Sequence, residues 1–240
     1  MQRSVDKLVH WIKAQVAAAG ARGVVVGMSG GIDSSVAAVL AKLALPDNTL
    51  GLLLPCHSIQ MDVDHAYMVA NKFQIPTRLI SLDSVFDAFL AGLSDDSLVP
   101  ATKILAEANL KPRIRMTTLY YFANRLHYLV VGSGNKCELG IGYFSKYGDG
   151  GVDILPLGNM VKRQVREMAR HVGIPEEVVD KPPSAGLWEG QTDEQEMGLT
   201  YDHLDTYFTS GKAPEDVRRR IEEKITRNAH KLVMPPAPPF

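Results

Sequence analysis

Apolar residues near the start of the chain follow two different spacings. The first set recurs every three or four residues, as on one face of an amphipathic helix, and consists of Val5, Leu8, Val9, Ile12 and Val16. Gly20 and Gly23 end this pattern. The run Val24–Val26 that follows is short, unbroken and β-branched, which predicts a buried strand.

The alternation of helix-like and strand-like segments continues along the chain. Further strands are predicted at Leu50–Leu54, Arg78–Leu82 and Leu129–Val131. Helices are predicted at Ser34–Leu45, 63–74, 84–93, about 100–110 and Ile114–Tyr128. Frequent glycines beyond Gly132 predict a loop system over one end of the sheet. Helices return at about 160–172, 201–208 and 214–229, and the tail MPPAPPF cannot be helical.

Strands that alternate with helices favour one architecture. Parallel strands need crossover connections, which helices usually provide. Strands built almost wholly from Val and Leu are typical of a sheet covered on both sides. The pattern predicts an α/β fold with a doubly wound, mostly parallel sheet and helices on both faces. No internal repeat or long linker divides the chain, so we expect a single domain over residues 1–240.

The composition limits the class of protein without choosing a function. Of the 240 residues, 45% are hydrophobic and 22% are charged, as in ordinary globular proteins. The formal net charge of −1 predicts no global attraction to nucleic acid. The N-terminus lacks the apolar stretch of a signal peptide, and no apolar run is long enough to span a bilayer. We therefore expect no membrane partner and a cytoplasmic protein.

The two cysteines, Cys56 and Cys137, form neither a CxxC pair nor a disulfide framework. Cys56 is followed by His57, and this pair raises the hypothesis of a nucleophile with its base. Neighbouring residues on a strand point to opposite faces, however, which places them poorly for catalysis. We therefore favour a buried, structural role for Cys56.

The strongest local signal is the segment Gly27–Ser35, with the sequence GMSGGIDSS, between a predicted strand and a predicted helix. That position is the carboxyl edge of the sheet, where ligands bind in doubly wound folds. Adjacent glycines let the backbone approach an anion, and the following helix adds the positive end of its dipole. The segment is neither GxxxxGK[ST] nor GxGxxG. The alternative is a turn that only caps a helix, and the spacing disfavours it.

This segment resembles SGGxDS, the pyrophosphate loop of the N-type ATP pyrophosphatases, which transfer AMP from ATP to an acceptor oxygen. Their fold is the adenine nucleotide alpha hydrolase-like one. Asp33 supports the resemblance, because a carboxylate beside phosphates is favourable only when a divalent cation lies between them. Mg²⁺ is commonly held by one or two carboxylates together with phosphate oxygens.

Four further stretches resemble the NAD synthetase family and follow that family's order. They are KPRIRM at 111–116, VGSGNKCELGIGYFSKYGDGGVDILPLG at 131–158, KPPSAGLWEGQTDEQEMG at 181–198, and His230-Lys231. KYGDGG and GLWEGQTDE discriminate this family much better than SGGxDS, which GMP synthetase, asparagine synthetase and tRNA-thiolating enzymes share. The run GSGN departs from the GTDH of some relatives, which affects only the expected adenine or ribose contacts.

The resemblance implies a role for each matching residue. ATP is expected to contact Gly27, Met28, Ser29, Gly30, Gly31, Ile32, Asp33, Ser34, Ser133, Lys162 and Ser184. Nicotinic acid adenine dinucleotide (deamido-NAD) is expected to contact Arg113, Lys146, Asp153, His230 and Lys231. The two magnesium ligands are matched by Asp33 and Glu138. Arg113 and Arg115 are both expected at a helix start, where a forked guanidinium suits a pyrophosphate or carboxylate.

The resemblance also implies a reaction and an assembly. The reaction is the ATP-dependent amidation of deamido-NAD by ammonia through an adenylated carboxylate, which yields NAD, AMP and pyrophosphate without a covalent nucleophile. Glutamine-dependent relatives carry an additional amidase domain, for which this chain has no room. Free ammonia is therefore the expected nitrogen donor, with supply by a separate subunit as the alternative. A homodimer is implied as well. The apolar residues around much of helix Ile114–Tyr128 fit a subunit interface, and a fully buried central helix is the alternative that the sequence leaves open.

Two other classes of protein remain open at the level of sequence. A tRNA-thiolating enzyme would commonly need extra cysteines or a basic RNA-binding surface, and the chain shows neither signal clearly. A non-enzymatic nucleotide-binding regulator would have little use for both Asp33 and Glu138. NAD synthesis is therefore the favoured hypothesis.

Overall fold

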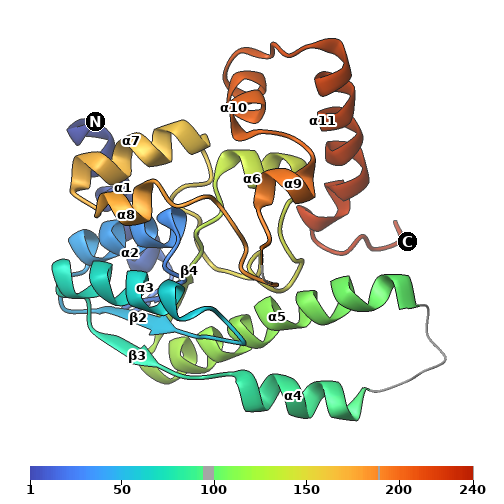
Figure 1. Ribbon diagram of the computed structural model, residues 1–240. Helices are drawn as coiled ribbons and strands as arrows, with labels where there is room; N and C mark the ends of the chain where they lie inside the picture. Colours follow the sequence, from blue (N-terminus) through green and yellow to red (C-terminus); the bar gives the residue numbers. More distant parts are fainter. Residues whose placement is uncertain (94–99, 189, 240) are drawn as a thin grey trace.

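Four parallel strands form the central sheet of the computed structural model, which describes residues 1–93, 100–188 and 190–239 (Figure 1). The strands are β1 (Gly23–Gly27), β2 (Thr49–Leu53), β3 (Thr77–Leu79) and β4 (Tyr128–Val131). Their order is β3-β2-β1-β4, and every pair is parallel. The predicted α/β fold with a parallel sheet is confirmed.

Helices connect and surround these strands. In chain order they are α1 (Gln2–Ala18), α2 (Ile32–Ala44), α3 (Gln60–Lys72), α4 (Asp83–Gly92), α5 (Pro100–Leu126), α6 (Lys136–Ile141), α7 (Lys162–Val172), α8 (Glu176–Val179), α9 (Asp193–Met197), α10 (Tyr201–Ser210), α11 (Glu215–Asn228) and the 3-10 helix η1 (Ala229–Lys231). Within the described part of the chain, no helix is both long and apolar enough to cross a membrane.

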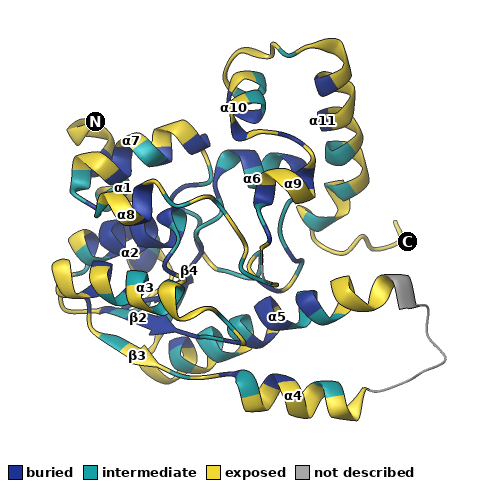
Figure 2. Ribbon diagram, in the orientation of Figure 1, coloured by how far each residue is buried: buried dark blue, intermediate teal, exposed yellow. Residues whose placement is uncertain are grey.

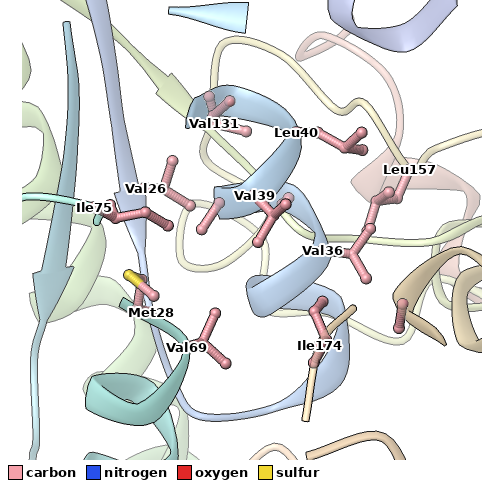
Figure 3. Close-up of a cluster of buried hydrophobic side chains, with 14 of the residues drawn as sticks. Val26, Met28, Val36, Val39, Leu40, Val69, Ile75, Val131, Leu157 and Ile174 are labelled. Carbon is pink, nitrogen blue, oxygen red and sulfur yellow. The ribbon is translucent and has the colours of Figure 1, made fainter. Parts of the chain in front are cut away.

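Helices cover both faces of the sheet, because successive side chains of a strand point to opposite sides. Val24 and Val26 of β1 pack into a cluster with α1, α2, α3 and α7, and Figure 3 shows part of it around Val39 and Leu40. Val25 points the other way, into a cluster with residues of α4 and α5. Strands β1 and β2 are almost wholly buried, as Figure 2 shows for β2, which explains their continuous apolar runs, whereas the edge strand β3 is largely exposed.

A third apolar cluster lies outside the sheet and joins α6, α10 and α11. In Figure 1, α10 and α11 stand together beside α6 and α9, away from the strands. Leu204, Val217 and Ile221 are among its buried members. This cluster fixes the segments that follow β4 against the C-terminal helices.

The strand order determines where a ligand can bind. The chain runs from β1 outward to β2 and β3 and then returns to β4 on the other side of β1. Val26 of β1 is paired with Val131 of β4, so the two strands end side by side. Such a reversal opens a crevice at the carboxyl ends of the two strands. The segment after β1 and the segment after β4 therefore meet there.

The structure corrects the prediction of two helices at about 100–110 and Ile114–Tyr128. They are one continuous helix, α5, with Pro112 inside it. Proline removes one backbone N–H, but Ala108, Lys111 and Ile114 around the proline are buried, so packing holds the helix together. Arg113 and Arg115 consequently lie in the middle of a helix and not at its start.

Other local differences are smaller. The short helices α6, α8 and α9 were not predicted, and β3 ends at Leu79, earlier than the predicted strand Arg78–Leu82. Helices of four to six residues show too little periodicity to be recognised from apolar spacing. Cys56 and Cys137 are free and buried, as predicted for Cys56.

Candidate active site

A large cavity opens at the carboxyl ends of β1, β2 and β4. Its volume is about 1170 Å³, which exceeds that of most sites for a single small ligand, about 300–1,000 Å³. Its lining includes every residue that the sequence assigned to ATP except Gly30, and also Glu138, His230 and Lys231. The structure therefore brings most of the predicted site residues to one place.

The segment Gly27–Ser35, called the phosphate loop after the role that its resemblance implies, has a compact internal structure. The backbone N–H of Ser29 donates to Ser34 Oγ (3.2 Å), and Ser34 Oγ donates to the carbonyl of Gly31 (3.0 Å). Gly31 is the N-cap of α2, so the dipole of this buried helix points its positive end at the cavity. Gly30 has φ +74°, and a Cβ there would lie 2.1 Å from the carbonyl oxygen of Asp62. Glycine is required at this position, although Gly30 does not line the cavity.

Two carboxylates and one ammonium group meet beside the loop. Lys162, at the start of α7, is 1% exposed, and its Nζ contacts Asp33 Oδ2 and lies 3.6 Å from Glu138 Oε1. Asp33 follows β1 and Glu138 follows β4, so the strand pairing explains how residues distant in sequence converge. The cluster is the most strongly charged part of the cavity wall near the phosphate loop.

The burial of this cluster changes its acid–base behaviour. Desolvation, with the nearby charge of Asp33, raises the pKa of Glu138 to about 8. Burial by itself would lower the pKa of Lys162, but Asp33 and Glu138 outweigh it and raise the pKa to about 12. The lysine therefore stays charged at neutral pH and compensates the two carboxyl groups.

Asn135 links the two carboxylates and was not foreseen. Its side-chain oxygen accepts from the backbone N–H of Cys137 (2.9 Å) and Glu138 (3.1 Å), while Glu138 Oε2 accepts from the Asn135 N–H (3.1 Å). Its Nδ2 donates to Asp33 Oδ1 (3.0 Å). The N-x-x-E spacing of this capping box is visible in the sequence and could have revealed α6.

Further polar residues support the cluster from a distance in sequence. Tyr201 Oη lies 3.0 Å from Glu138 Oε1 and 2.8 Å from Asp193 Oδ2. Asp205 accepts from the backbone N–H groups of Lys162 (2.9 Å) and Arg163 (2.8 Å), which fixes the start of α7. No local pattern marks Tyr201 or Asp205, because only tertiary packing brings them to the site, whereas Asp193 lies within the GLWEGQTDE stretch.

The residues assigned to deamido-NAD divide into two groups. His230 and Lys231 line the cavity, and Lys231 Nζ donates to the carbonyls of Gly142 (2.8 Å) and Phe144 (2.9 Å). The other three, Arg113, Lys146 and Asp153, do not line it. Lys146 Nζ donates to the carbonyl of His230 (2.7 Å), and Arg113 Nη2 donates to that of Lys146 (3.2 Å), so these two adjoin the C-terminal segment.

Asp153 is held by contacts within the chain. Its Oδ1 accepts from the hydroxyl of Tyr120 (2.9 Å), and its Oδ2 accepts from the backbone N–H of Val130 (2.7 Å). Ser184 lines the cavity and accepts from the N–H of Gly186 (3.0 Å). Glu189 of the GLWEGQTDE stretch and Phe240 of the tail lie outside the described residues.

The carboxylates fit a divalent cation that is shared with phosphates. Asp33 and Glu138 aim oxygens at the same point, which an ammonium group occupies. Among the described residues, no group of three or more His, Cys, Asp or Glu side chains is arranged to hold a metal. Mg²⁺ commonly takes one or two carboxylates and completes its shell with phosphate oxygens and water, so this donor set suits it.

We predict that Lys162→Met lowers the stability of the ligand-free protein and makes it depend on Mg²⁺. Removing one partner of a buried ion pair costs about 3–5 kcal/mol, because Asp33 and Glu138 would remain together without a cation. Thermal denaturation with and without Mg²⁺ measures both effects. We expect Mg²⁺ to restore more stability to Lys162→Met than it adds to the wild type.

The matched control is Lys181→Met, which removes the ammonium that pairs with Asp62 in the same cavity wall. This variant should gain no such response to Mg²⁺. Equal responses of the wild type and Lys162→Met to Mg²⁺ would contradict the prediction.

Comparisons with known proteins identify the family. The model of the NAD synthase family matches residues 4–235. The chain is 45% identical to the NH3-dependent NAD+ synthetase of Carboxydothermus hydrogenoformans, over 99% of this chain and 97% of that protein.

Solved structures agree with the sequence comparisons. The NMN synthetase from Francisella tularensis superposes with a TM-score of 0.93 at 38% identity, over 100% of this chain and 98% of the other. The NH3-dependent NAD synthetase from Campylobacter jejuni gives 0.81 at 27% identity, over 98% and 97%. The phosphate loop, the carboxylate pair and the order of the motifs agree with these matches. The chain belongs to the NAD synthase family.

Proposed function

We propose that the protein amidates the nicotinate carboxylate of deamido-NAD with ammonia, at the expense of ATP, and releases NAD, AMP and pyrophosphate. The observation that carries this proposal is the convergence of Asp33 and Glu138 on one point beside the phosphate loop. Membership of the NAD synthase family supports it. A regulator without activity would not need this buried and costly arrangement of charge.

The chemistry requires activation of the carboxylate. A carboxylate resists attack by ammonia, because its oxygen is a poor leaving group. A nicotinate oxygen therefore attacks the α-phosphorus of ATP, the bond to the bridging oxygen breaks, and pyrophosphate leaves. Ammonia then attacks the carbonyl carbon of the mixed anhydride, loses a proton, and displaces AMP. Each step conserves atoms and needs no covalent bond to the protein.

Charge neutralisation is the main task of the site, because the first step joins two anions. Asp33 and Glu138 would hold Mg²⁺, which would reduce the negative charge on the phosphates. The N-terminus of α2 and the hydroxyls of Ser29 and Ser34 would bind the pyrophosphate portion. Lys162, when a cation replaces it between the carboxylates, would be free to contact phosphate oxygens.

The C-terminal segment gives the cavity a second positive region. Lys224, Arg227, His230 and Lys231, on α11 and η1, all line the cavity. Burial lowers the pKa of Lys231, and its partners are neutral carbonyls, so an anion would be a favourable neighbour. We assign the acceptor nucleotide to this region, with Arg113, Lys146 and Asp153 completing its site beyond the cavity lining.

The proposal includes a homodimer and a cytoplasmic setting. Large apolar side chains are exposed on α4 (Val85, Phe89), directly after it (Leu93), near the start of α5 (Ile104, Leu105) and near its end (Tyr121). Figure 2 shows exposed positions along α4 and the first described turns of α5. Exposed apolar patches of this kind mark interaction surfaces. Both cysteines are buried free thiols, which suits a reducing compartment.

A second acceptor is supported by one observation. The match to the NMN synthetase from Francisella tularensis, with a TM-score of 0.93, covers the whole chain. Nicotinic acid mononucleotide carries the same nicotinate carboxylate as deamido-NAD, and the same adenylation would activate it. We therefore treat the mononucleotide as the alternative acceptor for this site.

The decisive assay measures products from ATP, Mg²⁺ and ammonium with deamido-NAD, with nicotinic acid mononucleotide, with tRNA, or with no acceptor. We expect NAD, AMP and pyrophosphate in equal amounts with deamido-NAD. If kcat/KM is higher with the mononucleotide than with deamido-NAD, the mononucleotide is the acceptor for this site. Release of ADP and phosphate in place of AMP and pyrophosphate would contradict the adenylation step.

We predict that Arg113→Ala raises the KM for deamido-NAD while the KM for ATP stays unchanged. Loss of a charged hydrogen bond to a phosphate or carboxylate weakens binding by about tenfold or more. Arg125→Ala, at the exposed C-terminal end of the same helix, is the control. Initial rates at varied dinucleotide concentration provide the measurement, and an unchanged KM would remove Arg113 from the site.

We predict that the full-length protein sediments as a dimer at micromolar concentration. Replacing Phe89 and Ile104 by Asp should shift it toward monomer, because both side chains are more than half exposed in the single chain, at 51% and 71%. Leu232→Asp, which changes a residue that is 53% exposed on the C-terminal segment, is the control. A wild-type monomer in analytical ultracentrifugation would contradict this assembly.

A further inference from the structure

One face of α5 forms a wall of the cavity. The helix residues that line it near the strands are Pro112, Arg115, Met116 and Leu119, which recur at the spacing of a single helix face. Arg113 is two positions from Arg115, and residues two apart on a helix do not face the same way. Arg113 is accordingly exposed and outside the cavity lining, whereas the Arg115 side chain points into the wall.

Arg115 has only uncharged partners. Its Nε donates to the carbonyl of Leu54 (3.0 Å), and its Nη2 donates to Ser58 Oγ (3.2 Å). In the part of the chain that the structure describes, no carboxylate forms an ion pair with it. Burial lowers the pKa of Arg115, yet a guanidinium remains charged in proteins.

Two carboxylates, Asp62 and Asp149, lie near enough to favour the charged form of Arg115, but neither forms an ion pair with it. Asp62 pairs with Lys181, and Asp149 accepts from the backbone N–H of Ser145 (2.9 Å). Burial raises the pKa of the neighbouring Cys56 thiol, which therefore stays neutral. Lys111, one helical turn before Arg115, is also buried and donates to the carbonyl of Leu187 (2.8 Å). Among the described residues, neither Arg115 nor Lys111 therefore forms an ion pair, and of the two only Arg115 lines the cavity.

Such an arrangement is costly unless a ligand supplies the anion. Removing a charge from water costs several kcal/mol when no counter-charge compensates it, so uncompensated buried charges tend to mark functional sites. A guanidinium has five N–H donors, and the contacts with Leu54 and Ser58 use only two of them. The remaining donors match the paired oxygens of a phosphate or a carboxylate.

The position of Arg115 relative to the sheet indicates what it can reach. Leu54 follows β2, while Glu138 follows β4, and β1 lies between these strands. The phosphate loop leaves β1. A ligand on the loop would therefore have the cluster of Asp33, Glu138 and Lys162 on one side and Arg115 on the other.

We propose that Arg115 binds an anionic oxygen, of a phosphate or a carboxylate, on the nucleotides that occupy the cavity. The contacts with Leu54 and Ser58 hold the guanidinium plane so that its free donors face the ligand. This assignment rests on the proposed function for the identity of the nucleotides. It differs from the role given to Arg113, which lies on another face of the same helix.

The test compares Arg115→Gln and Arg115→Lys with the wild type in equilibrium binding, without turnover. Isothermal titration calorimetry measures the affinity for ATP with Mg²⁺ and, separately, for deamido-NAD. Thermal denaturation of the ligand-free proteins is the second readout. Arg219→Gln, which removes the same charge from the exposed surface of α11, is the control.

We expect Arg115→Gln to weaken the binding of at least one nucleotide by about tenfold or more, which corresponds to 1.4 kcal/mol. The nucleotide affected identifies the anion. The ligand-free Tm should stay the same or rise, because a desolvated charge without an ion-pair partner is removed. Arg115→Lys should bind with intermediate affinity, since it keeps the charge and loses the fork.

Unchanged affinity for both nucleotides, together with a lowered Tm, would overturn the proposal and leave Arg115 with a purely structural role. If Arg115→Gln does not fold, Arg115→Lys is measured in its place. Unchanged affinity of Arg115→Lys for both nucleotides would also overturn the proposal. Failure of the wild type to form NAD would contradict the proposed reaction instead. The binding comparison with ATP would remain valid in that case.

Discussion

The site depends on the pairing of β1 with β4, which brings two carboxylates to one buried point. Asp33 and Glu138 come from segments about a hundred residues apart, and the register Val26 to Val131 makes them neighbours. Two acids in a dry environment repel each other and need a cation between them. Lys162 provides that cation within the chain. The pairing of β1 with β4 therefore makes positive charge favourable at this point, and a nucleotide with its bound metal would supply that charge here.

The surrounding structure fixes the geometry of this charge cluster. Asn135 ties Asp33 to the start of α6, and Asp205 ties the start of α7, where Lys162 lies, to α10. The Cys137 thiol also donates to Asp205 (3.1 Å), so the third apolar cluster and the charge cluster share a support. The helices outside the sheet are tied in this way to the charge cluster at the edge of the sheet. These helices position residues of the charge cluster that the sheet alone could not position.

The sequence predicts the parts of the molecule that depend on short segments. The spacing of apolar residues is enough to predict β1, β2 and α1, and GMSGGIDSS is enough to predict a glycine-bearing turn between a strand and a helix at the carboxyl edge of the sheet. Tyr201 and Asp193 could not be found in this way, because their role arises from contacts with Glu138 and with each other across tertiary structure. Glu138 was found through family resemblance, since a single glutamate has no local signature.

The error about α5 has the largest consequence for function. Proline usually marks a helix boundary, and two helices meeting at Pro112 would place Arg113 and Arg115 together at a flexible start. A continuous helix separates them onto different faces, so that Arg115 faces the cavity and Arg113 adjoins Lys146 and the C-terminal segment. The same rigid helix carries Ile104 and Leu105 on its exposed outer end. If the proposed dimer covers this end, it would contact the same helix that carries Arg115, and assembly would then be connected to the proposed nucleotide site.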